Sequence, residues 1–198
     1  MSRRKVIGIV LAAGQSNRMG WENKLTKNWR GRPLVAHVVD AARSSSLSDV
    51  VVVTGHQAKL VAEQCGGDVT LVHNPDFATG MASSLRVGIA QAQRLGTDAA
   101  LILLGDMPLV GSSDVDAIVD AYNGSGTAAI VQATGQGNPG NPVLFDHTLF
   151  AELLSLEGDM GARNVVKNHA DKRLLVEIGD AAARDFDTPA AFGKSEED

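Results

Sequence analysis

Short apolar runs alternate with helical patterns along most of this 198-residue chain, and the alternation limits the fold classes open to it. The runs are nearly continuous in Val, Ile, Leu and Ala, as expected for parallel strands buried on both faces. We predict an α/β fold, in which a single domain contains an open, mostly parallel, Rossmann-like sheet with helices on both faces. The predicted strands are residues 6–11, 50–54, 70–73, 99–104, 128–133 and 174–178, and the predicted helices are residues 33–43, 57–64, 81–95 and 113–122.

One segment interrupts the alternation. Residues 135–143 are rich in Gly, Asn and Pro, which predicts an irregular excursion before a short strand at residues 143–145. No linker or internal repeat is visible, so we predict one domain over residues 1–193. The last residues, 194–198, are predicted to form a disordered tail, because they are mostly acidic.

The first predicted strand leads directly into residues 12–20, AAGQSNRMG, and Lys24 follows. A Gly- and Ser-rich loop after a strand presents backbone N–H groups, which together with two cations suit a phosphate chain. It is not a P-loop, because five residues separate its two glycines and the required Lys-Ser/Thr pair is missing. The spacing also fails the G-x-G-x-x-G dinucleotide fingerprint. The segment therefore indicates a nucleotide site of another kind, with an ordinary strand-to-helix connection as the alternative.

Charge is distributed unevenly along the chain. Residues 1–32 contain eight Lys and Arg against one Glu, a net charge of +7, whereas the whole chain carries −5 and residues 33–198 therefore carry −12. This asymmetry favours a local anion site on an acidic molecule, and it disfavours a protein that coats nucleic acid or an anionic membrane. Only 4% of residues are aromatic, and no apolar run approaches the about 18 residues of a membrane span.

Ligands of open α/β sheets bind beyond the carboxyl ends of the strands, so the loops that follow the predicted strands should meet at one edge. Asn74 follows the third predicted strand and Asp106 follows the fourth. Asp106 stands where a buried strand reaches the surface, and Pro108 ends that strand. It is the strongest candidate for chemistry, with a helix cap or turn former as the alternative.

A series of motifs, in order along nearly the whole chain, resembles the molybdenum cofactor nucleotidyltransferases, and specifically their cytidylyltransferase branch. They are LAAGQSNRMG at residues 11–20 with Lys24, Asn74-Pro75, GMASSL at 80–85, LGDMP at 104–108, GNPVLF at 140–145, GDMGAR at 158–163 and DFDTP at 185–189. The resemblance implies the nucleotide-diphospho-sugar transferase fold. It also implies transfer of a nucleotidyl group, CMP above all, from a nucleoside triphosphate to a phosphate monoester, molybdopterin, with release of pyrophosphate.

The resemblance implies catalytic roles for Arg18, Lys24 and Asp106, with the two cations on the β- and γ-phosphates. It pairs Asp106 with Asp187 around one Mg²⁺, an ion that prefers one or two carboxylates together with phosphate oxygens and water. The residues that it places around the nucleotide or the acceptor are Leu11, Ala12, Ala13, Gly14, Ser16, Asn74, Ser83, Ser84, Asn141 and Arg163. Asn74 as a plain turn residue and Arg163 as a solvated helix charge stay open as alternatives.

Two positions bear on the substrates. Ala13 stands where the guanylyl-transferring relatives carry a second glycine, which favours CTP, although adenylyl-transferring relatives are hard to separate by this loop. The family commonly has His-Pro where this chain has Asn141-Pro142, and this departure leaves recognition of the pterin or of the acceptor's phosphate open.

Two other functions remain as alternatives. One is a cofactor-binding chaperone that serves the maturation of a molybdenum hydroxylase, which would then be its partner. The other is a sugar- or polyol-phosphate nucleotidyltransferase. We expect a cytoplasmic location, because the Ser2-Arg3-Arg4-Lys5 start resembles a twin-arginine signal only superficially, and cleavage near Ala13 would remove the phosphate loop.

Overall fold

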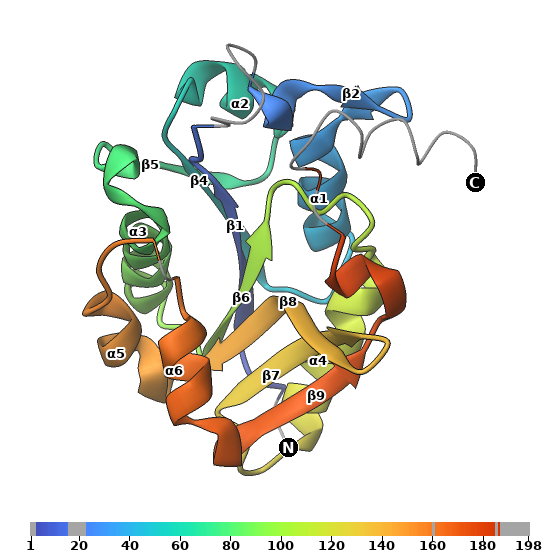
Figure 1. The fold of residues 1–198 in the computed structure, drawn as a ribbon, viewed down its shortest axis with the longest axis vertical. Helices are drawn as coiled ribbons and strands as arrows, with labels where there is room; N and C mark the ends of the chain where they lie inside the picture. Colours follow the sequence, from blue (N-terminus) through green and yellow to red (C-terminus); the bar gives the residue numbers. More distant parts are fainter. Residues whose placement is uncertain (1–2, 16–22, 160, 185, 187–198) are drawn as a thin grey trace.

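The computed structural model describes residues 3–15, 23–159, 161–184 and 186, which build a seven-stranded sheet flanked by helices (Figure 1). The strands lie in the order β5-β4-β1-β6-β8-β7-β9. Their bounds are β1 Val6–Ala12, β4 Asp49–Thr54, β5 Thr70–His73, β6 Ala99–Leu104, β7 Ile130–Gly135, β8 Asn138–Asp146 and β9 Arg173–Glu177. A separate short hairpin consists of β2 Asn28–Trp29 and β3 Arg32–Pro33.

Strand β1 occupies the centre of the parallel part of the sheet. It pairs in parallel with β4 and β6, so that Leu11 lies opposite Val53 on one side and Leu104 on the other. Six of its seven residues are buried, as its continuous apolar sequence predicts. The strands predicted at residues 6–11, 50–54, 70–73 and 99–104 are all present, within one residue of their predicted bounds.

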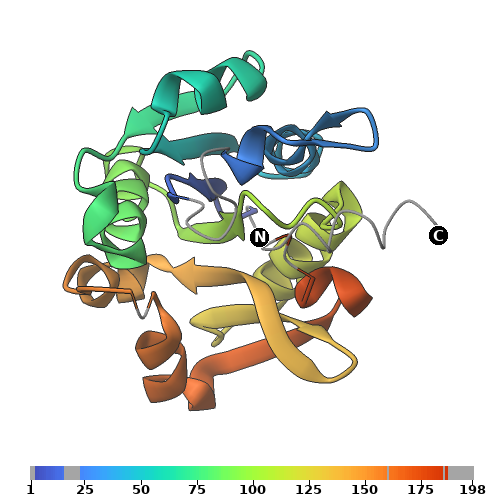
Figure 2. The same cartoon turned by 45° about the horizontal axis from the view of Figure 1, so that its top comes forward.

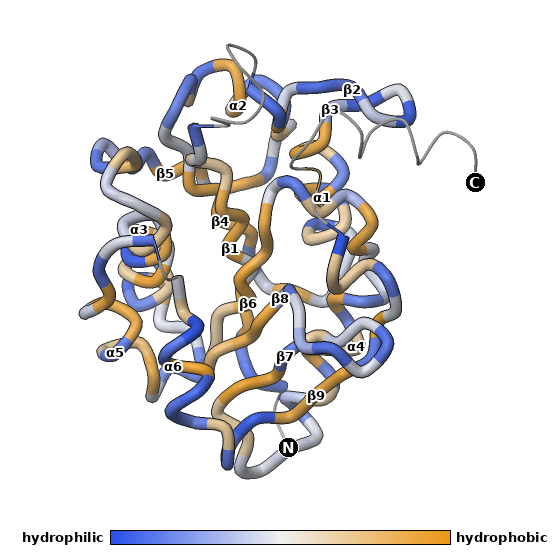
Figure 3. Tube along the Cα trace, viewed as in Figure 1, coloured by the Kyte–Doolittle hydropathy of each residue, from blue (hydrophilic) through white to orange (hydrophobic). Residues whose placement is uncertain are grey.

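Helices cover both faces of this sheet, as predicted (Figures 1 and 2). Side chains from α1 (Leu34–Arg43), α2 (Ala58–Gln64) and α4 (Ser112–Gly124) pack in one apolar core. Those from α3 (Met81–Arg94), α5 (Phe150–Leu154) and α6 (Arg163–Asn168) pack in a second core on the other face. Alternate residues of β1 serve the two cores, Val10 one and Ile9 the other, and the hydropathy colouring shows the apolar strands between more polar surroundings (Figure 3).

The prediction of an irregular excursion at residues 135–143 is wrong. Strand β8 occupies Asn138–Asp146, far more than the three residues predicted, and it runs antiparallel to both β6 and β7. The two residues between β7 and β8, Gln136 and Gly137, have φ angles of 51° and 78°. Two successive positive φ angles are characteristic of the two-residue turns that close tight hairpins. The Gly-, Asn- and Pro-rich composition therefore serves a hairpin.

A distant carboxylate holds this hairpin turn. Glu177 in β9 accepts hydrogen bonds from the Thr134 hydroxyl at 2.8 Å and from the N–H groups of Gln136 and Gly137 at 2.8 and 3.1 Å. These bonds, the one from Thr134 foremost, hold the pKa of Glu177 below its ordinary value. Because the turn depends on a residue some forty positions later, local composition could not predict it.

Other predictions were displaced or missed. The strand predicted at residues 128–133 is β7, Ile130–Gly135, and helices α5 and α6 were not predicted. Both helices are short, five and six residues, so each shows too little periodicity for detection. The predicted tail at residues 194–198 lies outside the described residues. Within the part of the chain that the structure describes, no helix is long and apolar enough to cross a membrane.

The tight packing of α3 on β1 leads to a stability prediction. A Cβ at Gly88 would lie 2.5 Å from Cγ2 of Ile9, a β-branched side chain in the core that cannot swing away. We expect Gly88→Ala to lower the free energy of unfolding by about 1–2 kcal/mol, because overpacking outweighs the better helix propensity of Ala. Chemical denaturation measures this change.

Gly124→Ala is the matched control. Gly124 is also helical, as the last residue of α4, but no atom lies within 4 Å of its Cβ position. The control is expected to leave stability unchanged or slightly raised. Equal stability of the two variants would contradict the packing that the structure gives α3.

Candidate functional site

The loops after the central parallel strands meet at one edge of the sheet, as predicted. The N–H of Gly105, after β6, donates to the carbonyl of Leu11, and the N–H of His56, after β4, donates to the carbonyl of Ala13. The N–H of Asn74, after β5, donates to the carbonyl of Thr54 at 2.7 Å. These bonds hold the strand ends and their loops in register, so their side chains share one edge.

A cavity of about 430 Å³ opens at this edge. Of the predicted site residues, Leu11, Ala13, Gly14, Lys24, Ser84 and Asp106 line it. Ala12 does not line it, because its side chain is fully buried in the core below. The lining also contains residues to which no role was assigned, namely Gln15, Leu25, Phe77, Ala78, Gly80, Met81, Leu104 and Asp159.

Lys24 and Asp106 form an ion pair in the wall of this cavity. The Lys24 Nζ atom lies 2.5 Å from Oδ2 of Asp106, and the two side chains are only 15% and 14% exposed. Lys24 begins a short 3-10 turn that Asn23 caps, since the Asn23 side chain accepts from the N–H of Leu25 at 3.1 Å. The cap fixes the start of the turn that carries Lys24. The Lys24 side chain thereby stays next to the carboxylate of Asp106, which follows β6.

The carboxyl-terminal segment of the described chain also reaches Asp106. The N–H of Phe186 donates to the backbone carbonyl of Asp106 at 3.1 Å, and the buried Phe186 ring lies edge-on to Trp29 with 5.3 Å between ring centroids. The chain at Phe186 therefore lies next to Asp106. Asp187 itself, with Arg18 and Ser16, lies outside the described residues, so the structure leaves their predicted roles untested.

Asn74, Ser83 and Ser84 form a buried hydrogen-bonded cluster. The Asn74 amide donates to the hydroxyls of Ser83 and Ser84 at 2.8 and 2.9 Å, and its carbonyl oxygen accepts from the N–H of Asp76 at 2.9 Å. Asn74 is 1% exposed. The cluster therefore ties the loop after β5 to the first turns of α3, and of its members only Ser84 lines the cavity.

The two remaining predicted residues do not line the cavity. Asn141 lies in β8 and is half-buried, whereas Arg163, the first residue of α6, is exposed. The structure thus separates the predicted site residues into a group that lines the cavity, around Lys24 and Asp106, and a pair outside it, on β8 and α6.

The carboxylates fit a hard divalent cation in part. Among the described residues, no three His, Cys, Asp or Glu side chains gather as a metal-binding group. Magnesium needs only one or two carboxylates when phosphate oxygens and water complete its shell. Asp106, in the cavity wall, supplies one such carboxylate, and its Lys24 partner would suit the phosphates.

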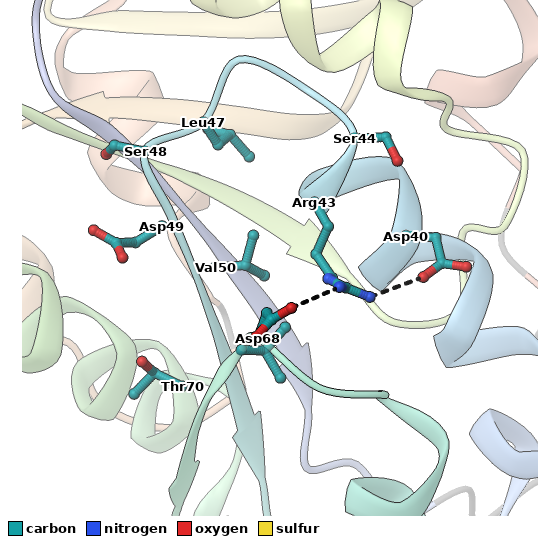
Figure 4. A pocket seen from close by; sticks show the side chains of 10 residues that line it. Asp40, Arg43, Ser44, Leu47, Ser48, Asp49, Val50, Asp68 and Thr70 are labelled. Atoms are coloured by element: carbon teal, nitrogen blue, oxygen red, sulfur yellow. Dashed lines mark hydrogen bonds and ion pairs between the residues drawn. The ribbon is translucent and has the colours of Figure 1, made fainter.

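A larger hollow, of about 680 Å³, lies near the amino-terminal ends of β4 and β5, beside the carboxyl end of α1 (Figure 4). It contains none of the predicted site residues. Its charges already have partners, because Arg43 lies 3.7 Å from Asp40 and 3.4 Å from Asp68, and Asp49 lies 3.7 Å from Lys5. Since ligands of such sheets bind beyond the carboxyl ends of the strands, the smaller cavity is the candidate site.

Comparison with known proteins identifies the class of this domain. Residues 8–173 match the MobA-like NTP transferase domain. GlmU of Brevibacillus brevis, a bifunctional protein, is 36% identical over 143 residues, but the match covers only 30% of GlmU against 67% of this chain. The chain therefore corresponds to about a third of the length of such relatives.

Two relatives match over nearly their whole length. The purine catabolism protein PucB of Bacillus subtilis is 30% identical over 203 residues, which cover 94% of both chains. The crystal structure of Rv0371c from Mycobacterium tuberculosis has a TM-score of 0.87 at 26% identity, covering 100% of both chains, and a manganese complex of Rv0371c superposes with a TM-score of 0.82 at 24% identity and 98% coverage of each chain. By these matches, this chain belongs to the family of MobA-like NTP transferase domains.

Proposed function

We propose that this protein transfers CMP from CTP to a phosphate monoester, with molybdopterin as the acceptor, and releases pyrophosphate. The observation that carries the proposal is the Lys24–Asp106 ion pair, which lies in a cavity with the loop residues Leu11, Ala13 and Gly14. Family membership supports nucleotidyl transfer from a nucleoside triphosphate. The motif resemblance supports the cytidylyl donor and the molybdopterin acceptor. We assign this activity to a single domain, residues 1–193.

Each part of the proposed site has a distinct task. The backbone of residues 11–14 and the Ser16 side chain cradle the phosphates, and Arg18 and Lys24 bind the β- and γ-phosphates of the leaving group. Asp106 and Asp187 hold the divalent ion, Mg²⁺, which supplies positive charge to the phosphate oxygens when bound. Asn74 and Ser83 position Ser84, which faces the nucleotide, and Ala12 supports the loop from below.

The reaction needs no general base. The second pKa of a phosphate monoester is about 6, so the acceptor is largely a dianion at neutral pH. One of its oxygens attacks the α-phosphorus, a new P–O bond forms, and the bond between the α-phosphorus and the bridging oxygen breaks. The electron pair of that bond leaves with pyrophosphate. What the protein must supply is orientation and relief of repulsion between two anions, which is the task of Lys24 and its neighbours.

The acceptor lies on the β8 and α6 side in this proposal. Arg163 clamps its phosphate, since the guanidinium group matches phosphate oxygens, and Asn141 contacts the remainder of the acceptor. A nucleotidyltransferase is favoured over a cofactor-binding chaperone, because a carrier would not need the Lys24–Asp106 pair. The product would then pass to a molybdenum hydroxylase.

Asp106→Asn tests the central carboxylate. The substitution keeps the size of the side chain but removes the charge that pairs with Lys24 and would hold the metal ion. We expect kcat for pyrophosphate release to fall by about two to three decades, equivalent to about 3–4 kcal/mol of lost transition-state stabilisation. Pyrophosphate release with molybdopterin, CTP and Mg²⁺ measures it.

Asp120→Asn is the control for this change. Asp120 also forms an ion pair, with Arg3, but its side chain is 69% exposed on the surface. The control should keep full activity, since surface pairs contribute little. Near-native turnover by Asp106→Asn would refute the proposed role of Asp106.

The choice of nucleotide is testable by thermal shift. Titration with CTP, GTP and ATP, each with Mg²⁺, should give the largest rise in melting temperature with CTP. At equal concentrations, the nucleotide that binds the native state most tightly stabilises it most. The position of Ala13 in the cavity wall carries this expectation. A clear preference for GTP would overturn the cytidylyl assignment.

Mass spectrometry tests the acceptor. After incubation with molybdopterin and CTP, a product with the mass of the cofactor dinucleotide is expected if molybdopterin is the acceptor.

A further inference from the structure

The segment before α6 is fastened to the beginning of α3. The N–H of Met81 donates to Oδ1 of Asp159 at 3.2 Å, and the N–H of Ala82 donates to the carbonyl of Gly158 at 3.0 Å. One turn further along α3, the Arg86 guanidinium donates to the carbonyl of Leu156 at 2.8 Å. Three successive attachments therefore join two parts of the chain that are 70 to 78 residues apart.

Glycine makes this close approach possible. Gly80 has a φ of 116°, and a Cβ there would lie 2.6 Å from Asp159 Oδ1 and from the Gly158 carbonyl. On the other side, a Cβ at Gly161 would lie 3.1 Å from the sulfur of Met81. The contact between the two segments therefore requires the glycine at position 80.

The attachment lies in the wall of the candidate nucleotide cavity. Gly80, Met81, Ser84 and Asp159 all line it, on the side contributed by α3, whereas Lys24 and Asp106 come from other segments. The first N–H groups of a helix have no partner within the helix, and their partial positive charge attracts anions. Asp159 and Gly158 already accept hydrogen bonds from the N–H groups of Met81 and Ala82, so these two groups hold the wall in place and are not available to the triphosphate.

We propose that Asp159 is a positioning residue for the nucleotide: its carboxylate holds Met81 and the first turn of α3 as a rigid cavity wall, and links that wall to the segment leading to Arg163. The inference rests on the proposed function, because it assigns the nucleotide to this cavity. When a nucleotide orders the first turn of α3, the same contact therefore also orders the segment that leads to Arg163, on the side where the acceptor is placed.

Two substitutions separate the hydrogen bond from the charge. Asp159→Asn keeps an oxygen that accepts from Met81, whereas Asp159→Ala removes it. We expect Asp159→Ala to raise the Kd for CTP with Mg²⁺ about tenfold, because the hydrogen bond to a helix N-terminus is lost, and Asp159→Asn to stay within about twofold of the wild type. Glu157→Ala is the matched control, since Glu157, like Asp159, is an exposed acid of the same segment, but it does not accept the hydrogen bond from Met81.

Hydrogen exchange of the full-length protein, with and without CTP and Mg²⁺, supplies the second readout. In the wild type, nucleotide should slow exchange both at residues 80–86 and across 156–163. In Asp159→Ala, the slowing across 156–163 should disappear while the middle of α3 stays protected, which a generally unfolded variant would not show.

The outcomes separate the inference from the proposed function. If the wild type binds no nucleoside triphosphate at all, the proposed function fails and the inference fails with it. If the wild type binds CTP, but Asp159→Ala binds equally well and keeps the nucleotide-dependent protection, only the inference is overturned. Equal losses in the Asn and Ala variants would also overturn it, because the charge rather than the hydrogen bond would then matter.

Discussion

The parallel pairing of β1 with both β4 and β6 is the constraint on which the candidate site depends. It brings the ends of three strands to one edge, and the bonds from Gly105 to Leu11 and from His56 to Ala13 hold the loops that follow. Lys24 and Asp106, 82 positions apart in the sequence, meet as a consequence. A different strand order would leave the same residues on separate surfaces.

The Lys24–Asp106 pair is largely removed from water, and this gives it chemical consequences. Because burial makes an isolated charge costly, the carboxylate of Asp106 depends on a nearby cation such as the Lys24 ammonium group. A polyphosphate with its divalent ion offers both partners a replacement, phosphate oxygens for the ammonium group and a cation for the carboxylate. The ion pairs in the larger hollow beside α1 are more exposed to water, since the side chains of Arg43 and Asp68 are 34% and 92% exposed, so replacing these partners by a ligand would gain less.

The fold class and the gathering of several predicted residues around one cavity could be predicted because their signals are local. Continuous apolar runs identified β1, β4 and β6, and the loop after β1 with Lys24 and Asp106 followed from the strand ends. The β7–β8 hairpin was missed because Glu177, far along the chain, holds its turn.

Sequence reasoning missed other features of the candidate site for similar reasons. Asp159 received no role from the sequence, since its partner, the N–H of Met81, becomes a neighbour only in the folded chain. Asn74 was assigned to the nucleotide or a plain turn, but its amide is used within the protein, on Ser83 and Ser84. The Gly80–Met81 and Gly158–Asp159 motifs were visible separately, and only the fold shows that they contact each other.

A crystal structure with a non-hydrolysable CTP analogue and Mn²⁺ tests the central claim most directly, because the anomalous signal of manganese locates the ion independently of the protein atoms. The account predicts the manganese peak within coordinating distance of the Asp106 carboxylate, with the Lys24 ammonium group moved onto the phosphates. Manganese and phosphates bound away from Asp106, for example in the hollow lined by Asp40, Arg43 and Asp68, would contradict it.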